Sequence, residues 1–268
     1  MIVLEERGER REEREYLQSA KYGAQGIPSA DAAQTSVSAE LSAHNTNLSL
    51  LSSLSSPLSS LLSPLYFSPI QWYQKLNRSG NVLIEQHEHF LKQTYRNRCV
   101  IATAQGLQTL SVPVEAPSSA ALSKTAIKDV RISDHGKWRT EHWNALQSAY
   151  GESPFFEYYE DDIRPFFEQR WTFLLDFNMA ITGKMCELLD IHPNISLTTA
   201  YMMVPSSSEN TDGIVDFRTS IRPKHPLPDA DFVLRPYYQV FREKFGFQPN
   251  LSVLDLLFNM GNESIFYL

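Results

Sequence analysis

Cysteine is almost absent from this chain, with only Cys99 and Cys186 among 268 residues. Each lies in an apolar segment, and neither a CxxC pair nor the Cys/His spacing of a zinc site occurs. Two buried thiols are therefore expected rather than a disulfide. Such sparse cysteine usage points to a reducing, cytoplasmic location.

Long apolar runs and excess positive charge are also lacking. No apolar run reaches about 18 residues, so no membrane span is expected. The formal net charge is −7, which argues against nonspecific nucleic-acid binding, because that needs a basic surface. The sequence has no P-loop, GxGxxG or GxSxG motif, and no DxD in a strand context. The motifs name no cofactor, and the oligomeric state is left open.

The first 63 residues differ in composition from the rest. Residues 5–15 are mostly Glu and Arg, and residues 23–47 are rich in Gly, Ala, Ser and Asn; residues 48–62 contain seven Leu, seven Ser and one Pro. Such composition buries too little apolar surface to offset chain entropy, so residues 1–63 are expected to be a disordered extension. A signal peptide is the alternative for the Leu/Ser tract, although serines break it and it starts far along the chain.

Residues 64–268 can bury a sizeable core, and hydrophobic period and punctuation predict its elements. The predicted strands are 65–67, 81–85, 99–104, 108–114, 127–132 and 196–204. The predicted helices are 69–77, 137–150, one starting at Ser153-Pro154, 167–189, 237–245 and 252–260. Strands lead and helices dominate the second half. This order predicts a single α/β domain with a mixed sheet flanked by helices.

Several short sequence blocks in residues 64–268 match a known pattern in both their residues and their order. The run KQTYRNRC at 92–99 is followed by SVPV at 111–114. Further blocks are YFSPIQWYQKL (66–76), HWNALQSAYGESPFFEYYEDDI (142–163), LLDFN (174–178) and YYQVFREKFGFQPNLSVLDLLFNMG (237–261). Together they resemble the WbqC-like family over about residues 64–268. The resemblance implies a setting in gene clusters for lipopolysaccharide O-antigen and other surface polysaccharides, but no settled reaction. Many members open with a His-Gln-Pro-Asn-Tyr type motif, and the matching stretch here, residues 65–69, has no His.

The run from Glu85 to Cys99 has the densest group of long polar side chains. If it is extended, Lys92, Arg96 and Arg98 project to one face, where they could hold a phosphate or carboxylate. The predicted binding residues of this run are Lys92, Gln93, Tyr95, Arg96, Asn97 and Arg98. The alternative is a set of salt bridges to the acidic segment 157–162.

The start of the same run allows a second interpretation. Glu85, His87 and His89 would also alternate onto one face, and His-x-His beside a carboxylate can bind a transition metal. An exposed polar strand end explains the pattern equally simply, and no metal site is predicted.

Two residues outside the run are candidate catalytic groups. His142 lies on the apolar face of its helix, four residues after Trp138, where it is either a hydrogen-bonded core residue or a general base. Asp216 stands beside Arg218 just after a polar loop, so the pair is either part of a site or a local ion pair.

Aromatic and acidic residues interleave over residues 150–162, a mixture that suits sugar binding. Tyr158 is the candidate contact. The alternative is that the rings enter the core and the acids begin the next helix, where the helix dipole favours them.

The polar run, taken with the surface-polysaccharide setting that the family resemblance implies, leads us to expect a group-transfer enzyme of that biosynthesis, acting on an activated or anionic sugar or acyl substrate. The expected partner is thus a small molecule or a sugar-linked substrate. The alternative is a non-catalytic glycan-binding or assembly protein that uses Tyr158 and Tyr159.

Overall fold

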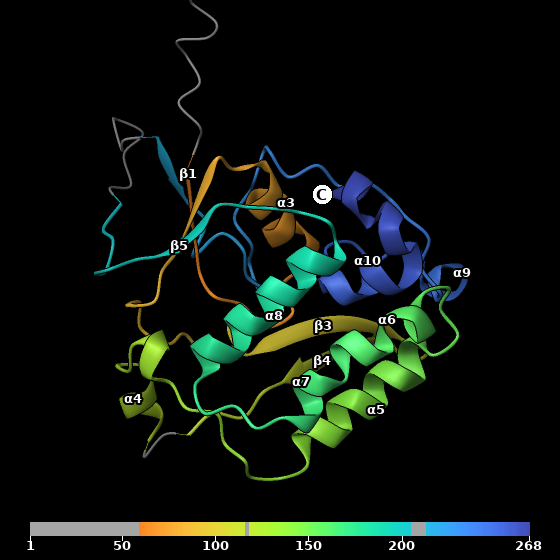
Figure 1. Ribbon diagram of the computed structural model, residues 1–268, viewed down its shortest axis with the longest axis horizontal. Helices are drawn as coiled ribbons and strands as arrows, with labels where there is room; N and C mark the ends of the chain where they lie inside the picture. Colours follow the sequence, from red (N-terminus) through yellow and green to blue (C-terminus); the bar gives the residue numbers. More distant parts are fainter. Residues whose placement is uncertain (1–58, 116–117, 205–212) are drawn as a thin grey trace, which may run out of the picture. The chain divides into compact units, whose positions relative to one another are not determined.

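Four short parallel strands make one sheet in the computed structural model, which describes residues 59–115, 118–204 and 213–268 (Figure 1). The strands, in spatial order, are β5 (Ile195–Leu197), β2 (Asn81–Ile84), β1 (Ser59–Leu62) and β6 (Ile214–Asp216). All of them belong to one compact part of the chain, Ser56–Leu268.

β1 is an inner strand of this sheet. Leu61 pairs with Leu83 on one side and Asp216 on the other. Leu61 and Leu62 are both fully buried. Since neighbouring strand residues point to opposite faces, both faces of the sheet are covered here. The structured body therefore includes Ser59–Leu62, which the sequence analysis placed in the extension. The disorder predicted for residues 1–58 lies outside the described residues.

Helix α3 (Ile70–Arg78) connects β1 to the parallel strand β2. It begins directly after Pro69, as expected from a residue whose fixed φ suits a helix start. The strand predicted at 65–67 is instead a turn, in which Phe67 has a φ of 36°. The apolar residues there enter the core from a loop.

The predicted hairpin is confirmed, with strands β3 (Arg98–Thr103) and β4 (Gly106–Ser111). The left-handed φ of 110° at Gly106 explains a glycine in its turn. This antiparallel pair forms a sheet of its own, so the parallel and antiparallel pairings occupy separate sheets. Helices α5 (Trp138–Tyr150) and α10 (Val253–Met260) both contact β3, and the hairpin lies between them (Figure 1).

Helices make up most of the remaining structure, and their positions correct several predictions. They are α4 (Ser119–Leu122), η2 (Ile127–Asp129), α5 (Trp138–Tyr150), α6 (Phe156–Ile163), α7 (Pro165–Glu168), α8 (Leu174–Leu188), α9 (Arg242–Phe245), α10 (Val253–Met260) and η3 (Gly261–Tyr267). The helix predicted at 167–189 is interrupted, because Thr172 and Leu174 hydrogen-bond through their backbones to Ile132 and Val130. The strand predicted at 127–132 is wrong, because Ile127–Asp129 forms η2 and only isolated bridges follow it. The strand predicted at 196–204 and the helix predicted at 237–245 are much shorter than expected.

An aromatic cluster occupies the centre of the helical half. Tyr66 stacks on Phe177, with ring centroids 5.7 Å apart, and Phe67 stacks on Phe167 at 6.0 Å. Large rings dominate the energetics of such cores. The α/β class predicted from the sequence is confirmed. Across the part of the chain that the structure describes, no helix is long and apolar enough to cross a bilayer.

Candidate functional site

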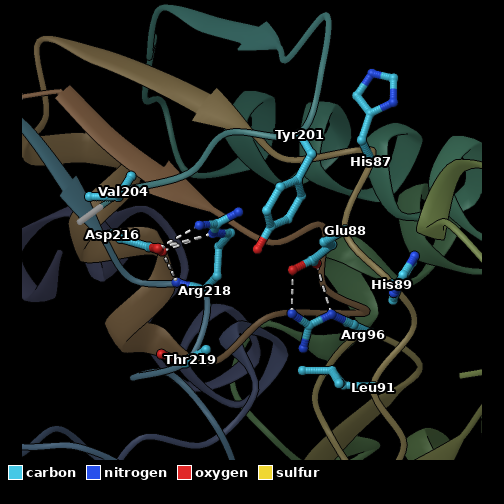
Figure 2. Close-up of a pocket in the computed structure, with 10 residues that line it drawn as sticks. All are labelled: His87, Glu88, His89, Leu91, Arg96, Tyr201, Val204, Asp216, Arg218 and Thr219. Atoms are coloured by element: carbon cyan, nitrogen blue, oxygen red, sulfur yellow. Dashed lines mark hydrogen bonds and ion pairs between the residues drawn. The ribbon is translucent and has the colours of Figure 1, made fainter. Parts of the chain in front are cut away.

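A pocket of about 670 Å³ opens at the carboxyl edge of the parallel sheet (Figure 2). Every residue that lines it comes from the end of a strand or from the segment after one, namely β2, β5 or β6. The lining residues are His87, Glu88, His89, Leu91, Arg96, Tyr201, Val204, Asp216, Arg218 and Thr219. Ligands of open α/β sheets bind at this edge, because all parallel strands deliver their following loops to it.

The first wall of the pocket is the pair of Glu88 and Arg96. Arg96 donates from Nε to Glu88 Oε1 at 2.8 Å and from Nη2 to Glu88 Oε2 at 2.6 Å. Arg96 Nη2 also donates to Ser63 Oγ at 2.8 Å, and that hydroxyl donates onward to Glu88 Oε2 at 3.2 Å. Arg96 is only 2 % exposed. The paired geometry holds the guanidinium and the carboxylate in one plane.

The second wall is the pair of Asp216 and Arg218. Arg218 Nη2 donates to Asp216 Oδ2 at 2.7 Å, and its Nε lies 3.0 Å from Oδ1. Burial acts to lower the pKa of Arg218, but the carboxylate of Asp216 outweighs it, so the pKa is raised. Arg218 therefore stays charged beside the pocket.

Glu85 joins the segments behind these walls and is fully buried. Its Oε1 accepts from Thr198 Oγ1 at 2.8 Å, and its Oε2 accepts from the backbone of Met202 at 2.8 Å. Arg218 Nη1 reaches the same Oε2 at 3.4 Å. One carboxylate thus ties the segments that follow β2, β5 and β6 together, which fixes the shape of the pocket.

Tyr201 stands between the two charged pairs. Figure 2 shows its hydroxyl pointing into the space between Arg218 and Glu88. Its ring lies over the guanidinium of Arg218, with 5.0 Å from Cζ to the ring centroid. The side chain is still 54 % exposed, so this aromatic surface is available to a ligand.

Two histidines complete the rim. His87 and His89 both line the pocket, and the backbone N–H of His87 donates to Glu85 Oε1 at 2.8 Å. Histidine is the side chain best suited to exchange a proton near neutral pH. Among the residues that the structure describes, no group of three or more His, Cys, Asp or Glu side chains could hold a metal ion.

The pocket brings together three of the predicted site residues, Arg96, Asp216 and Arg218, and with them His87 and His89, which the sequence had suggested as possible metal ligands. The other members of the 92–98 run lie elsewhere. Gln93 has a left-handed φ of 59°, and residues 92–97 form turns rather than a strand. The expected common face therefore does not form: Lys92 projects to solvent, Arg96 turns inward and Arg98 begins β3.

The residues next to Arg96 in the run, Gln93, Tyr95 and Asn97, do not line the pocket. Gln93 is exposed, whereas Tyr95 and Asn97 are buried. Asn97 Nδ2 donates to the backbone carbonyl of Val112 at 2.8 Å, which ties the run to the end of the hairpin. Tyr95 and Asn97 thus pack behind Arg96 and lie outside the pocket lining.

His142 lies in the aromatic core, away from the pocket lining. It is 5 % exposed, and its Nδ1 is 2.9 Å from the hydroxyl of Tyr66. Burial lowers the pKa of His142 to about 4, although an interaction with the Ser111 backbone acts in the opposite direction. This environment matches the core interpretation, and the structure does not bring His142 to the candidate site.

Tyr158 is likewise remote from the pocket lining, on α6, with 73 % of its surface exposed. Its neighbour Tyr159 is buried, and its hydroxyl donates a hydrogen bond to Asn262 Oδ1 at 2.9 Å. The pair therefore does not present two rings to a ligand.

Sequence reasoning missed Tyr201 and Thr219 and gave Glu88 no role of its own. Glu88 belongs to the polar run that starts at Glu85, so its neighbourhood was visible. Tyr201 follows a strand of three residues, and no local pattern marks it. The usable signal is position: polar residues just after parallel strands meet at one edge of the sheet.

Fold and pocket define an α/β protein with a polar site at the carboxyl edge of a parallel sheet. Comparison of sequences gives the family: the model of the WbqC-like protein family matches residues 63–225. The match covers more than half of the chain, so the chain belongs to this family. The matched range includes every residue of the pocket lining, while the similar blocks after residue 225 fall outside it.

A relative from Mycobacterium tuberculosis (strain ATCC 25618 / H37Rv) is named uncharacterized protein Rv1507c. It is 29 % identical over 209 residues, covering 69 % of this chain and 86 % of the relative. No solved structure matches the chain.

Proposed function

We propose that this chain is a cytoplasmic enzyme of surface-polysaccharide biosynthesis, of the O-antigen type, that transfers a group to or from a sugar. The observation that carries the proposal is the pocket with two opposed arginine–carboxylate pairs and Tyr201 between them. The pathway is supported by the family resemblance. The compartment is supported by Cys99 and Cys186, which are both buried and free.

A sugar suits this pocket better than an anion would. Both guanidinium groups are already bonded to carboxylates, so neither is an uncommitted cation. Each pair instead offers fixed donors and acceptors side by side, and a sugar hydroxyl can use both. The partly exposed ring of Tyr201 can pack against the C–H face of a sugar. A few convergent polar groups around a concave site are typical of small-molecule pockets.

The proposed reaction is transfer of a group from an activated donor to a nucleophilic atom of the bound sugar. The bond from that atom to the group forms as the bond from the group to its leaving group breaks. The nucleophile loses its proton to a base, and the leaving group departs with the bonding electron pair. His87 and His89 are the candidate bases, because they line the pocket while His142 does not.

Thermal-shift titration of the full-length protein tests ligand class directly. Nucleotide-sugars, free sugars, acyl donors and amino acids form the panel. A ligand at 100 times its Kd stabilises the folded state by about 2.7 kcal/mol. We expect a shift with a sugar-containing class, and we expect Arg218→Gln to remove it. Arg164→Gln is the matched control, because Arg164 is exposed and bonds to Glu168 outside the pocket lining.

Product formation then tests catalysis. Protein, the stabilising sugar and a donor are incubated together, and a mass shift of the sugar is sought. Absence of any shift across the panel in the thermal assay would count against the sugar pocket itself.

A non-catalytic glycan-binding or assembly role is the second candidate. It is favoured by the mutual pairing of the pocket's arginines and carboxylates, since groups that already bond to each other are less free to act in a reaction. Among the described lining residues, the histidines remain as the candidates for proton transfer. This role predicts that His87→Gln with His89→Gln keeps sugar binding and in-cell function. The enzyme proposal predicts that the double variant still binds sugar but forms no product.

A further inference from the structure

We infer that the pocket is specific for a sugar that carries a free amino group, and that the ammonium of this sugar binds Glu88. This inference rests on the proposed function, since it names the substrate class of the same site. It follows from the charge balance of the pocket, the spare acceptor capacity of one carboxylate and the position of Tyr201.

The charge balance of the network is negative. Three carboxylates belong to it, those of Glu85, Glu88 and Asp216, whereas two guanidinium groups oppose them. One formal negative charge remains when the histidines are neutral. Burial makes such an imbalance costly, and a ligand with a single positive charge removes it. A phosphate or carboxylate ligand would increase it.

The unfilled acceptor position lies on Glu88. Glu85 and Asp216 each accept two hydrogen bonds at both of their oxygens. Glu88 Oε2 also accepts two, from Arg96 and Ser63, but from the residues that the structure describes Oε1 accepts one bond, from Arg96 Nε. A carboxylate oxygen has two lone pairs. Oε1 of Glu88 can therefore accept one more donor, and Glu88 lines the pocket.

The surroundings of Glu88 suit an ammonium on a sugar ring. Figure 2 shows the carboxylate of Glu88 on the side of the pocket that the hydroxyl of Tyr201 faces. An ammonium has three donors and no acceptor, so one N–H can meet Glu88 Oε1 while the other two remain for further acceptors around the pocket. The Asp216–Arg218 pair forms the opposite wall, and its donors and acceptors are available to the other hydroxyls of the ring.

Matched sugars distinguish the amine from other ligand chemistry. Glucosamine, N-acetylglucosamine, glucose and glucose 1-phosphate are titrated into the full-length protein at pH 7, with binding followed by NMR. We expect glucosamine to bind at least tenfold more tightly than the other three, a difference of about 1.4 kcal/mol. The preference should weaken as salt is added, because ionic strength screens charge–charge attraction.

Glu88→Gln locates the selectivity. The variant keeps the shape of the side chain and removes its charge, so the tenfold preference should fall to less than twofold. Glu168→Gln is the control, since Glu168 is an exposed acid paired with an arginine outside the pocket lining. If Glu88→Gln does not fold, the comparison of the four sugars in the unmodified protein, with its salt dependence, still tests whether the pocket prefers an amino sugar.

Each other outcome has a defined meaning. Equal or tighter binding of glucose 1-phosphate overturns the amine inference and leaves the sugar pocket standing. A preference that survives in Glu88→Gln overturns the role of Glu88. Binding of none of the four sugars overturns the inference and the proposed function together.

Discussion

Arg96 is a cation whose charge is already balanced inside the protein. Its guanidinium is held by Glu88 in two parallel hydrogen bonds and by the hydroxyl of Ser63. A buried pair of this kind contributes little net stability when complete, but breaking it leaves an uncompensated charge. The main role of Arg96 is therefore to shape the pocket wall, and contact with a ligand is a lesser role.

Arg96→Lys is expected to lower the free energy of unfolding by about 2 kcal/mol. Lysine keeps the charge but cannot make two parallel bonds, and one hydrogen bond to a charged group contributes about 1.5–3 kcal/mol. The sequence alone left two interpretations, an anion site or salt bridges to the acidic segment 157–162, and neither names the buried partner Glu88. Urea unfolding measures the difference, with Arg164→Lys as control, where an exposed pair contributes about 0–1 kcal/mol. Equal effects of the two substitutions would contradict the buried pairing.

His142 is expected to make stability depend on pH. Its pKa in the folded protein is about 4, below the value of about 6.5 for unfolded chains. The unfolded state therefore binds more protons between these values, and stability rises with pH. The contribution is complete above about pH 6.5 and lost as pH falls toward 4, to a total of about 3 kcal/mol.

The measurement compares urea unfolding at pH 4.5 and 7.5 for the unmodified protein and His142→Gln. The variant should lose most of the pH dependence that His142 contributes, while other titrating groups affect both proteins alike. Identical pH dependence in the two would show that His142 is accessible to protons in the folded state.

At the residue scale, the sequence pointed to those pocket residues that stand out among their neighbours along the chain. Arg96 stood in a dense polar run, and Asp216 with Arg218 followed a polar loop. What it could not predict was direction. The turns around Gln93 rotate Arg96 inward and Lys92 outward, and this depends on backbone angles that residue type does not determine.

Among the elements, α10 shows how one buried acid joins several parts of the chain. Asp255 is 1 % exposed and accepts from the hydroxyls of Tyr150 at 2.8 Å and Tyr237 at 2.5 Å. Gln239 Nε2 adds a third bond at 2.9 Å. Burial raises the pKa of Asp255, while the three donors act to lower it. The side chain points into the core rather than capping its own helix.

Asp255→Leu is therefore expected to lower the free energy of unfolding by about 3–5 kcal/mol, because three buried donors lose their acceptor. Asp255→Asn should cost less, about 1–3 kcal/mol, since the amide oxygen still accepts. Chemical denaturation of both variants checks this order, with the exposed Asp176→Asn as control. A leucine variant as stable as the natural protein would show that the network contributes nothing.

Elements with strong local signals were predicted well. The helix after Pro69, the hairpin around Gly106 and the helix that ends at Gly261 all carry turn or cap residues at their ends. β1 and β6 are strands of four and three residues without such signals. These residues become strands because β1 and β6 pair with each other. That pairing forms only when distant parts of the chain come together, so local sequence does not reveal it.

In the whole molecule, β1 decides where the domain must begin. A chain shortened to start at residue 64 lacks the inner strand that pairs with both β2 and β6. A chain that starts at residue 56 keeps it. We expect the longer form to unfold cooperatively and the shorter one to be unfolded or aggregated, as judged by circular dichroism and urea titration. Cooperative unfolding of the 64–268 chain with normal stability would contradict the role of β1.

The pairing of β1 with β6 also has a consequence for synthesis of the chain. Ser59 pairs with Ile214, so a strand made early waits for one made much later. At about 5–20 residues per second, that wait lasts roughly ten to thirty seconds. During it, one edge of β1 has no neighbour, and an open strand edge can recruit another nascent chain. Protein yield in cells should therefore depend on translation speed and on chaperones that cover this edge.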